Sequence, residues 1–203
     1  MEDNTGFNWN IIFASRNTNK LTEIASILPS YITLRSLSDV GVLEELPETT
    51  GTISGNAAQK AMYVWHSVGA DALADDSGLE VEALGGRPGV DSAFFAGQPR
   101  NDARNMMYLL DQLEGISDRR ASFVTVIALV LGGDLRLFEG RVKGRITEAP
   151  RGSNGFGYDP VFIPDGYDET FGQLSPSIKQ SISHRARAVQ SLRDYLSTLD
   201  LGR

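Results

Sequence analysis

The pattern of apolar and polar positions predicts alternating strands and helices over the first third of the chain. Ile11–Ala14 is an apolar run typical of a buried strand, and Ile32–Leu37 alternates like a second strand. Asn19–Leu28 and Asn56–Val68 each repeat apolar side chains at helical spacing, which predicts two helices with one buried face. This order favours parallel strands joined by helical crossovers.

The centre of the chain is predicted to be rich in strands. Ala72–Ala74 and Leu79–Leu84 are expected as two short strands on either side of a turn with the sequence DDSG. Ala121–Leu131 and Leu135–Val142, separated by GlyGlyAsp, predict a long hairpin. Crossovers combined with a hairpin indicate an α/β fold, so we expect one domain over residues 1–203 with helices flanking a mixed central β-sheet.

Two further helices and a long loop complete the predicted elements. One helix is expected at Asn101–Leu113 and the other after Ser183, a good N-cap for an amphipathic helix that runs to Leu199. Between them, Glu148–Gln180 is rich in Gly, Pro, Ser and Asp, which predicts a long ordered loop of the kind that commonly carries function. The acidic and polar leader before Asn10 is expected to be disordered.

Composition and charge exclude several classes of protein. With 203 residues, of which 41% are apolar and 22% charged, the chain has the makeup of a globular protein. Its net charge of -7 repels a nucleic-acid backbone, so we expect no nucleic-acid partner, but a few well-placed cations can still bind a nucleotide. The absence of cysteine excludes disulfides and thiolate catalysis and is compatible with the reducing cytoplasm, where we expect the protein to reside. The longest apolar run, Val124–Leu131, is too short for a membrane span, and no signal peptide is expected.

A first candidate site is the segment SRNTNK, Ser15–Lys20, between the first predicted strand and helix. Free backbone N–H groups and the helix dipole favour an anion at such a position, and Lys20 adds a full positive charge. The spacing matches neither the P-loop nor the dinucleotide-binding pattern. The alternative is a polar turn that caps the helix, with Lys20 and Glu23 as a solvated pair.

A second candidate site centres on Asp75 and Asp76. Adjacent carboxylates repel, so they are better tolerated beside a cation or in an exposed turn. Mg²⁺ typically takes one or two protein carboxylates plus phosphate oxygens, and Glu48, in the upstream LPETTG segment, could be the second ligand. The alternative is a plain Asp-rich turn between strands.

A third candidate site is the glycine-rich segment Arg151–Pro160, RGSNGFGYDP. Its glycines leave backbone N–H groups accessible, while Phe156 and Tyr158 offer flat faces on which a base can stack. The alternative is a turn that buries Phe156 in the core.

A fourth candidate site is the segment KQSISHRARA, in which Lys179 is predicted to precede the last helix, with His184 and Arg185 in its first turn. Cations are disfavoured at a helix N-terminus, so this arrangement suggests a bound anion or polar ligand. The alternative is a solvated start of the helix.

These four segments, in this order, resemble the inosine triphosphatase family, the XTP/dITP diphosphatases that remove nonstandard purine nucleoside triphosphates. The most specific pieces are GFGYDPVF at Gly155–Phe162 and SHRARA at Ser183–Ala188, supported by Ala74–Gly97 and by NTNKLTEI near the start. The resemblance implies an elongated α/β fold with two lobes around a nucleotide cleft, commonly as a homodimer. It also implies Mg²⁺-dependent hydrolysis of ITP, dITP or XTP to the monophosphate and pyrophosphate.

The resemblance also assigns roles to residues of this chain. Glu48 and Asp76 are the implied metal ligands, and Asp76 is also the implied proton acceptor for the attacking water. Arg185 would donate to the 6-oxo group of the purine but would meet the amino group of adenine donor to donor, so ATP is expected to be rejected. The implied substrate-binding residues are Ser15, Arg16, Asn17, Thr18, Asn19, Lys20 and Lys60 for the phosphates, together with Ser77, Phe156, Gly157, Tyr158, Asp159, Lys179, His184 and Arg185.

Two single positions and one short segment depart from the family pattern. Arg16 stands where the family loop usually has glycine, and Gly55 stands where many bacterial members have glutamate. The segment Gly172–Leu174 also differs from the usual one. Arg16 and Gly55 suggest one alternative to hydrolysis of nonstandard purine nucleotides, a purine-nucleotide-binding protein that has lost turnover. A separate alternative is a Maf-like pyrophosphatase of other nucleotides.

Overall fold

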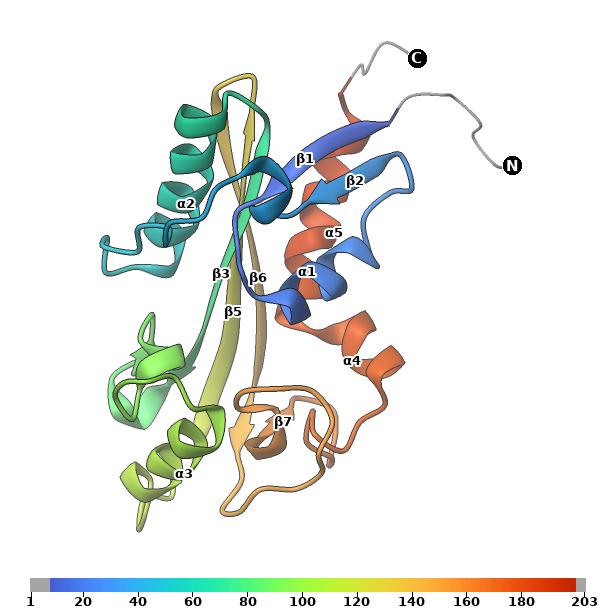
Figure 1. Ribbon diagram of the computed structural model, residues 1–203. Coiled ribbons are helices and arrows are strands. Elements are labelled where there is room, and N and C mark those ends of the chain that lie inside the picture. The colour runs from blue at the N-terminus through green and yellow to red at the C-terminus, as the bar shows by residue number, and fades with distance from the viewer. Residues whose placement is uncertain (1–7, 200–203) are drawn as a thin grey trace. The chain divides into compact units, whose positions relative to one another are not determined.

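The computed structural model describes residues 8–199, so residues 1–7, most of the leader predicted to be disordered, lie outside the described part (Figure 1). Trp9 and Asn10 already belong to a strand, and the indole Nε1 of Trp9 donates to Asp71 Oδ2 over 2.9 Å. The strands are β1 (Trp9–Phe13), β2 (Ile32–Arg35), β3 (Ala72–Val81), β4 (Pro88–Gly89), β5 (Arg120–Leu131), β6 (Asp134–Ile146) and β7 (Phe162–Pro164). The helices are α1 (Thr18–Ala25), α2 (Ile53–Val68), α3 (Asp102–Gln112), α4 (Pro176–Ile182) and α5 (His184–Ser197), with short 3-10 helices at η1 (Ser38–Val40), η2 (Glu82–Leu84), η3 (Ser92–Phe94) and η4 (Asp159–Val161).

The strands of residues 8–199 form one mixed sheet in the order β2-β1-β3-β5-β6-β7, with β4 paired to β3. β1 runs parallel to both β2 and β3, while β7 is antiparallel to β6. β5 and β6 are sheet neighbours joined through Gly132 and Gly133, whose positive φ angles of 57° and 95° suit a tight turn. The predicted mixed α/β sheet and its long hairpin are therefore confirmed.

The described chain forms two compact units, and the residues of β3, β5 and β6 are divided between them. The first unit comprises the described residues up to Asp76, residues 126–139, and the described residues from Arg187 onward. The second unit comprises residues 77–125 and 140–186.

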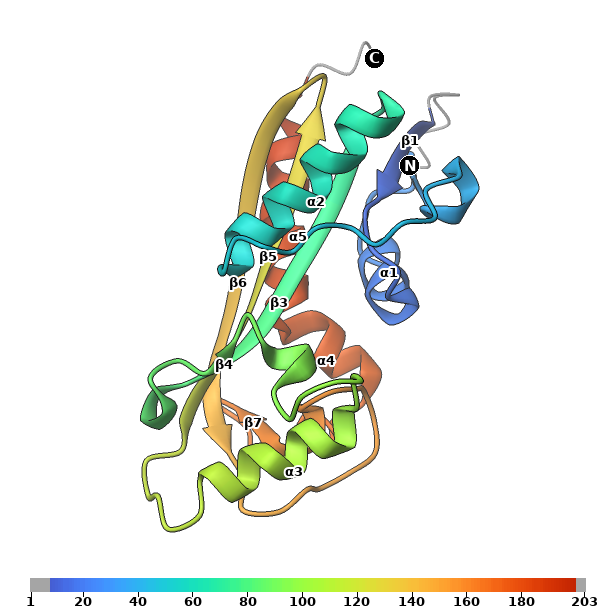
Figure 2. The ribbon, with the colours of Figure 1, turned by 60° about the vertical axis from the view of Figure 1, so that its left-hand side comes forward.

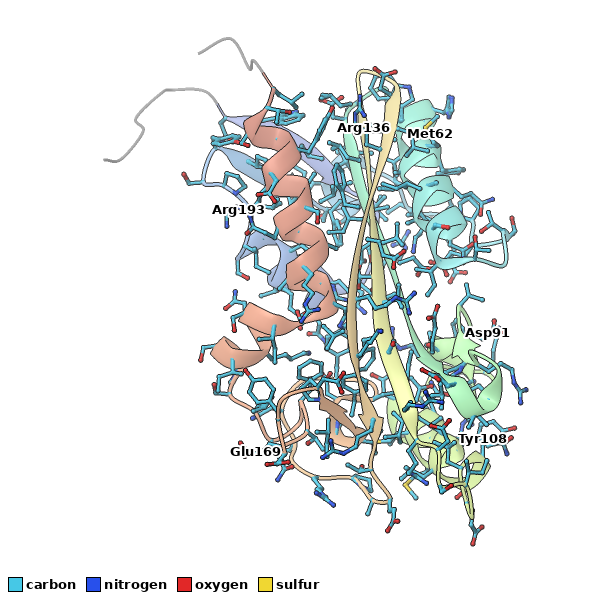
Figure 3. The ribbon with its side chains drawn as sticks, turned by 180° about the vertical axis from the view of Figure 1, so that it is seen from behind. Met62, Asp91, Tyr108, Arg136, Glu169 and Arg193 are labelled. Carbon is cyan, nitrogen blue, oxygen red and sulfur yellow. The ribbon has the colours of Figure 1, made fainter. Side chains whose placement is uncertain are left out.

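In the first unit, α1 and α5 pack on the sheet face opposite to α2 (Figures 1 and 2). The apolar spacing predicted for these helices fills the core, since Ile24 of α1 and Val189 of α5 are both fully buried. At the turn end of the hairpin, the Arg136 guanidinium lies 4.8 Å from the centre of the Tyr195 ring (Figure 3). The buried cluster on this face includes Ile11, Phe13, Ile24, Leu73, Ile127, Leu129, Ala188, Val189, Leu192 and Leu196.

In the second unit, α3 supplies its apolar face to a separate core. Asn101 is the N-cap of this helix, because its side chain accepts from the Arg104 N–H over 2.9 Å. Aromatic rings dominate this core, with Phe123 and Phe162 centred 4.6 Å apart. Its buried members include Leu79, Val81, Leu109, Leu113, Phe123, Val142, Tyr158, Phe162 and Phe171.

Two predictions about local structure are wrong. The DDSG sequence is not a turn between two strands, because β3 continues from Ala72 to Val81 and the three residues after it form η2. Residues 148–180 are not one long loop, since they contain η4, β7 and most of α4, so Lys179 lies within a helix instead of before one. Helix α4 is short and begins at Pro176, which obscures its pattern in the sequence.

None of the helices in residues 8–199 has the length and apolar character that crossing a membrane requires.

Candidate active site

The loop between β1 and α1 presents the start of a helix, as predicted. The Asn17 side chain accepts from the Lys20 N–H over 3.2 Å, and the Asn17 N–H donates to Ser15 Oγ over 3.2 Å. Thr18 and Asn19 are exposed in the first turn. Backbone N–H groups and the helix dipole therefore favour an anion at this loop.

Lys20 pairs with the first of the two aspartates on β3. Because β1 and β3 are parallel neighbours, with Phe13 opposite Leu73, the residues that follow these positions meet at one place in the sheet. Lys20 Nζ lies 3.1 Å from Asp75 Oδ1, and the Asp75 side chain is fully buried. A buried carboxylate needs a charged partner, so this pair explains how β3 can continue through DDSG.

Asp76 pairs with a second ammonium, which comes from α2. Successive residues of a strand point to opposite faces of the sheet, which gives the adjacent aspartates different partners. Lys60 Nζ lies 3.4 Å from Asp76 Oδ1 and 2.5 Å from Glu48 Oε1. Burial raises the pKa of Asp76, and this outweighs the lowering by Lys60 and Lys20. Burial alone would lower the pKa of Lys60, but the charges of Asp76, Glu48 and Asp75 raise it above its usual value.

The predicted metal ligands, Glu48 and Asp76, lie against the same ammonium. In residues 8–199, no three His, Cys, Asp or Glu side chains are grouped so that they could hold a metal ion by themselves. Asp76 Oδ2, however, is buried and has no hydrogen-bond partner. The two carboxylates fit an ion such as Mg²⁺, which takes few protein ligands and completes its shell with phosphate oxygens and water.

Arg16 is turned toward the segment that carries Glu48. Its Nη2 donates to Glu44 O over 2.8 Å and to Val42 O over 3.3 Å. Arg16, which departs from the family pattern, is therefore hydrogen-bonded to backbone carbonyl groups of its own unit.

In the second unit, Asp159 organises the glycine-rich segment. Its Oδ2 accepts from the Phe156 N–H and from Lys179 Nζ, each over 2.7 Å. Gly155 has a φ of 77°, and a Cβ there would overlap the Asp159 carboxylate, whose Cγ lies 2.8 Å away. Only glycine fits this position, and the Gly157 N–H donates to Asp102 Oδ2 over 3.1 Å.

Two cations lie against the face of Phe156. Lys179 Nζ is 4.9 Å and Arg185 Cζ is 5.8 Å from the centre of its ring. Arg185 is only 1% exposed, although it occupies the first turn of α5. A half-buried aromatic ring beside two cations can stack a base and donate to its polar edge.

A hydroxyl group of β3 holds Arg185 and is itself held by a buried threonine. Its Nη2 donates to Ser77 Oγ over 3.2 Å, and Ser77 Oγ lies 2.7 Å from Thr125 Oγ1. The His184 ring stacks on Phe123, with centroids 4.7 Å apart and planes 11° apart.

Tyr158 is directed into the core of the second unit. The residue is 5% exposed, and its hydroxyl donates to Ser92 O over 2.9 Å. Burial, aided by the charge of Asp102, raises the pKa of Tyr158, so the hydroxyl stays a donor to a higher pH than that of an exposed tyrosine.

The structure thus gathers ten of the predicted residues into two groups, one in each unit. The first unit brings together Lys20, Glu48, Lys60, Asp75 and Asp76. The second brings together Ser77, Phe156, Asp159, Lys179 and Arg185.

Sequence reasoning did not identify two residues that support these groups. Thr125, which contacts Ser77, is the only hydroxyl in the apolar run Val124–Leu131, and this was the available signal. Asp102, which holds the Gly157 N–H, gave no signal beyond its place at the start of a predicted helix.

Comparison with known proteins gives consistent matches. The model of the Ham1 family matches residues 11–195. A Flavobacterium johnsoniae protein named dITP/XTP pyrophosphatase is 51% identical over 187 residues, which cover 92% of this chain and 97% of that protein. The structure of a HAM1 protein from Coxiella burnetii has a TM-score of 0.88 and 38% identity, covering 94% of this chain and 100% of that one. The nucleoside-triphosphatase / dITP/XTP pyrophosphatase from Mycobacterium abscessus has a TM-score of 0.76 and 45% identity, covering 90% and 98%.

Proposed function

The chain belongs to the Ham1 family, and we propose that it hydrolyses nonstandard purine nucleoside triphosphates, dITP and XTP among them, to the nucleoside monophosphate and pyrophosphate. Hydrolysis of ITP is part of the same proposal. The match over residues 11–195 includes residues of both units, which supports one nucleotide-hydrolysing domain. The nucleotide cleft and the homodimer expected from the family resemblance, and the cytoplasmic location expected from the absence of cysteine, stay predictions.

The observation that carries the proposal is the charged cluster of the first unit. Two ammonium groups, from Lys20 and Lys60, face three carboxylates, from Glu48, Asp75 and Asp76. The excess of negative charge and the unpartnered Asp76 Oδ2 favour a divalent cation, and Glu48 and Asp76 would hold Mg²⁺.

Each group of this cluster has a defined task in the proposed reaction. The Asp76 carboxylate can also take the proton of the attacking water. Lys20 and Lys60 offset the negative charge of the phosphates and of the pyrophosphate that leaves. The loop at Ser15–Asn19 binds phosphate oxygens through its backbone N–H groups and through the exposed side chains of Thr18 and Asn19. When bound, Mg²⁺ supplies polarisation of the phosphate group.

The second unit supplies the recognition of the base. Phe156 stacks the purine ring, and Lys179 is held in place by Asp159. Arg185 donates to the 6-oxo oxygen of hypoxanthine or xanthine. Adenine carries an amino group at that position, so the guanidinium of Arg185 and the amino group would both be donors. Because neither could accept a hydrogen bond from the other, ATP is a poor substrate.

The test is release of pyrophosphate from ITP, XTP, dITP, GTP, ATP and dTTP with Mg²⁺, by the wild-type protein and by the Asp76→Asn variant. We expect release from ITP, XTP and dITP, and its loss in Asp76→Asn with nucleotide binding retained. Asp134→Asn is the matched control, because Asp134 is exposed at the start of β6.

Other outcomes would select the alternatives. ITP binding without pyrophosphate release would indicate a nucleotide-binding protein that has lost turnover. Release from dTTP alone would indicate a Maf-like pyrophosphatase. Full activity of Asp76→Asn would refute the role of Asp76.

A further inference from the structure

The segment Gly41–Thr52 connects η1 to α2 without a helix or strand of its own, and it carries Glu48. We call this segment the strap. Because it has no backbone ladder to a neighbouring strand, the position of Glu48 depends on contacts made by side chains. The Glu48 side chain is 46% exposed, so packing does little to hold it.

Side chains of α2 hold the strap along one side. The Tyr63 hydroxyl donates to Glu44 Oε1 over 2.9 Å, and Lys60 Nζ donates to Glu48 Oε1 over 2.5 Å. Nearer the start of α2, the Thr49 N–H donates to Gln59 Oε1 over 2.9 Å, and the Thr50 N–H donates to Asn56 Oδ1 over 3.1 Å.

Arg16 holds the strap from the phosphate loop. Its Nη2 donates to the carbonyls of Glu44 and Val42, over 2.8 and 3.3 Å. Glu44 is therefore held twice, through its carbonyl by Arg16 and through its carboxylate by Tyr63. The guanidinium joins the loop that is proposed to bind phosphate to the segment that is proposed to supply a metal ligand.

We propose that Arg16 is a positioning residue, which sets the place of Glu48 by fixing the strap, and that it is not a phosphate ligand. This inference rests on the proposed function only in taking Glu48 as a metal ligand. Hydrogen bonds from a charged donor are stronger than neutral ones, so two of them can hold an exposed segment. Arg16 stands where the family resemblance places glycine, which cannot make this contact.

Amide hydrogen exchange, measured without metal or nucleotide, tests the contact itself. We expect the amides of Leu43, Thr49 and Thr50, which donate to side chains, to exchange roughly 10-fold faster in Arg16→Ala than in the wild type, because the charge-assisted hydrogen bonds that hold the strap are lost. Tyr63→Phe should accelerate the same amides, since it releases Glu44 from the other side. Arg35→Ala is the matched control, because Arg35 also donates to a carbonyl, that of Asp39, but outside the strap.

The Mg²⁺ dependence of pyrophosphate release tests the consequence for the metal site. In Arg16→Ala, the Mg²⁺ concentration for half-maximal rate should rise about 10-fold, as is typical when support for a metal ligand is removed. The KM for ITP at saturating Mg²⁺ should change little. Arg16→Lys keeps the positive charge but replaces the planar guanidinium by an ammonium group. This variant should restore part of the wild-type Mg²⁺ affinity.

The opposite pattern would overturn the inference. If Arg16 binds phosphate, Arg16→Ala will raise the KM for ITP at saturating Mg²⁺ and leave strap exchange and Mg²⁺ demand unchanged. If the wild type releases pyrophosphate from no purine nucleotide, the proposed function fails. In that case unchanged exchange in Arg16→Ala would still refute the positioning role.

Discussion

Arg185 donates a hydrogen bond to Ser77 over 3.2 Å, from the first turn of α5 to β3 within the second unit. Ser77 is in turn held by Thr125 on β5. A guanidinium that reads the purine edge must keep its orientation, and these two hydroxyls restrict it.

We therefore expect Ser77→Ala to lower discrimination between ITP and ATP. The ratio of their kcat/KM values should fall by roughly 10-fold, because Arg185 loses a hydrogen bond that orients it. Steady-state kinetics with both nucleotides measures the ratio. Ser153→Ala, at an exposed serine of the same unit, is the control. An unchanged ratio in Ser77→Ala would show that this hydroxyl does not orient Arg185.

Lys60→Met should make the stability of the protein depend on metal. The variant leaves the buried Asp76 carboxylate without the Lys60 ammonium. Breaking a buried ion pair in this way lowers the free energy of unfolding by about 3 kcal/mol. In the variant, Mg²⁺ no longer competes with Lys60 for the carboxylates. Addition of Mg²⁺ should therefore raise the melting temperature more in the variant than in the wild type. Thermal unfolding with EDTA and with Mg²⁺ measures both effects. Lys143→Met, at an exposed lysine, should match the wild type under both conditions.

Gly55→Ala should destabilise the protein, although alanine is the better helix former by about 1 kcal/mol. A Cβ at position 55 would overlap the Thr50 hydroxyl and lie 2.7 Å from both Thr50 Cβ and Thr52 Oγ1. Overpacking of this kind costs about 1 to 3 kcal/mol, which exceeds the gain in helix propensity. Chemical denaturation measures the change, and adding Thr50→Ala should recover part of the loss. A stabilised Gly55→Ala variant would contradict the prediction.

Tyr158→Phe should cost about 1 kcal/mol at neutral pH, the usual net contribution of one hydrogen bond. Burial raises the pKa of Tyr158 above its usual value of 10.0, so the folded state favours the protonated hydroxyl. The stabilisation by the protonated hydroxyl is complete at pH values below the pKa that Tyr158 has in the unfolded state. It is lost as the pH rises toward the higher pKa of the folded state. The difference between wild type and variant should therefore shrink above about pH 10, as measured by denaturation across a pH series. A difference that grows with pH would contradict the raised pKa.

The sequence by itself determined the features that depend on local patterns. Apolar spacing located α1, α2 and α5, because a helix repeats its buried face every few residues. The paired glycines at 132 and 133 located the hairpin, because a positive φ at a turn favours glycine. Motifs such as GFGYDPVF likewise identified the family, since they are contiguous in the chain.

Only the tertiary structure decided how the charged residues are used. The DDSG sequence has the composition of a turn, yet it lies in a strand because Lys20 and Lys60, distant in the chain, neutralise its carboxylates. Arg16 and Thr125 likewise take their roles from partners that lie 28 and 48 positions away. Burial of a charge or hydroxyl is favourable only when a partner meets it, and no local pattern encodes a partner that the fold brings from elsewhere in the chain.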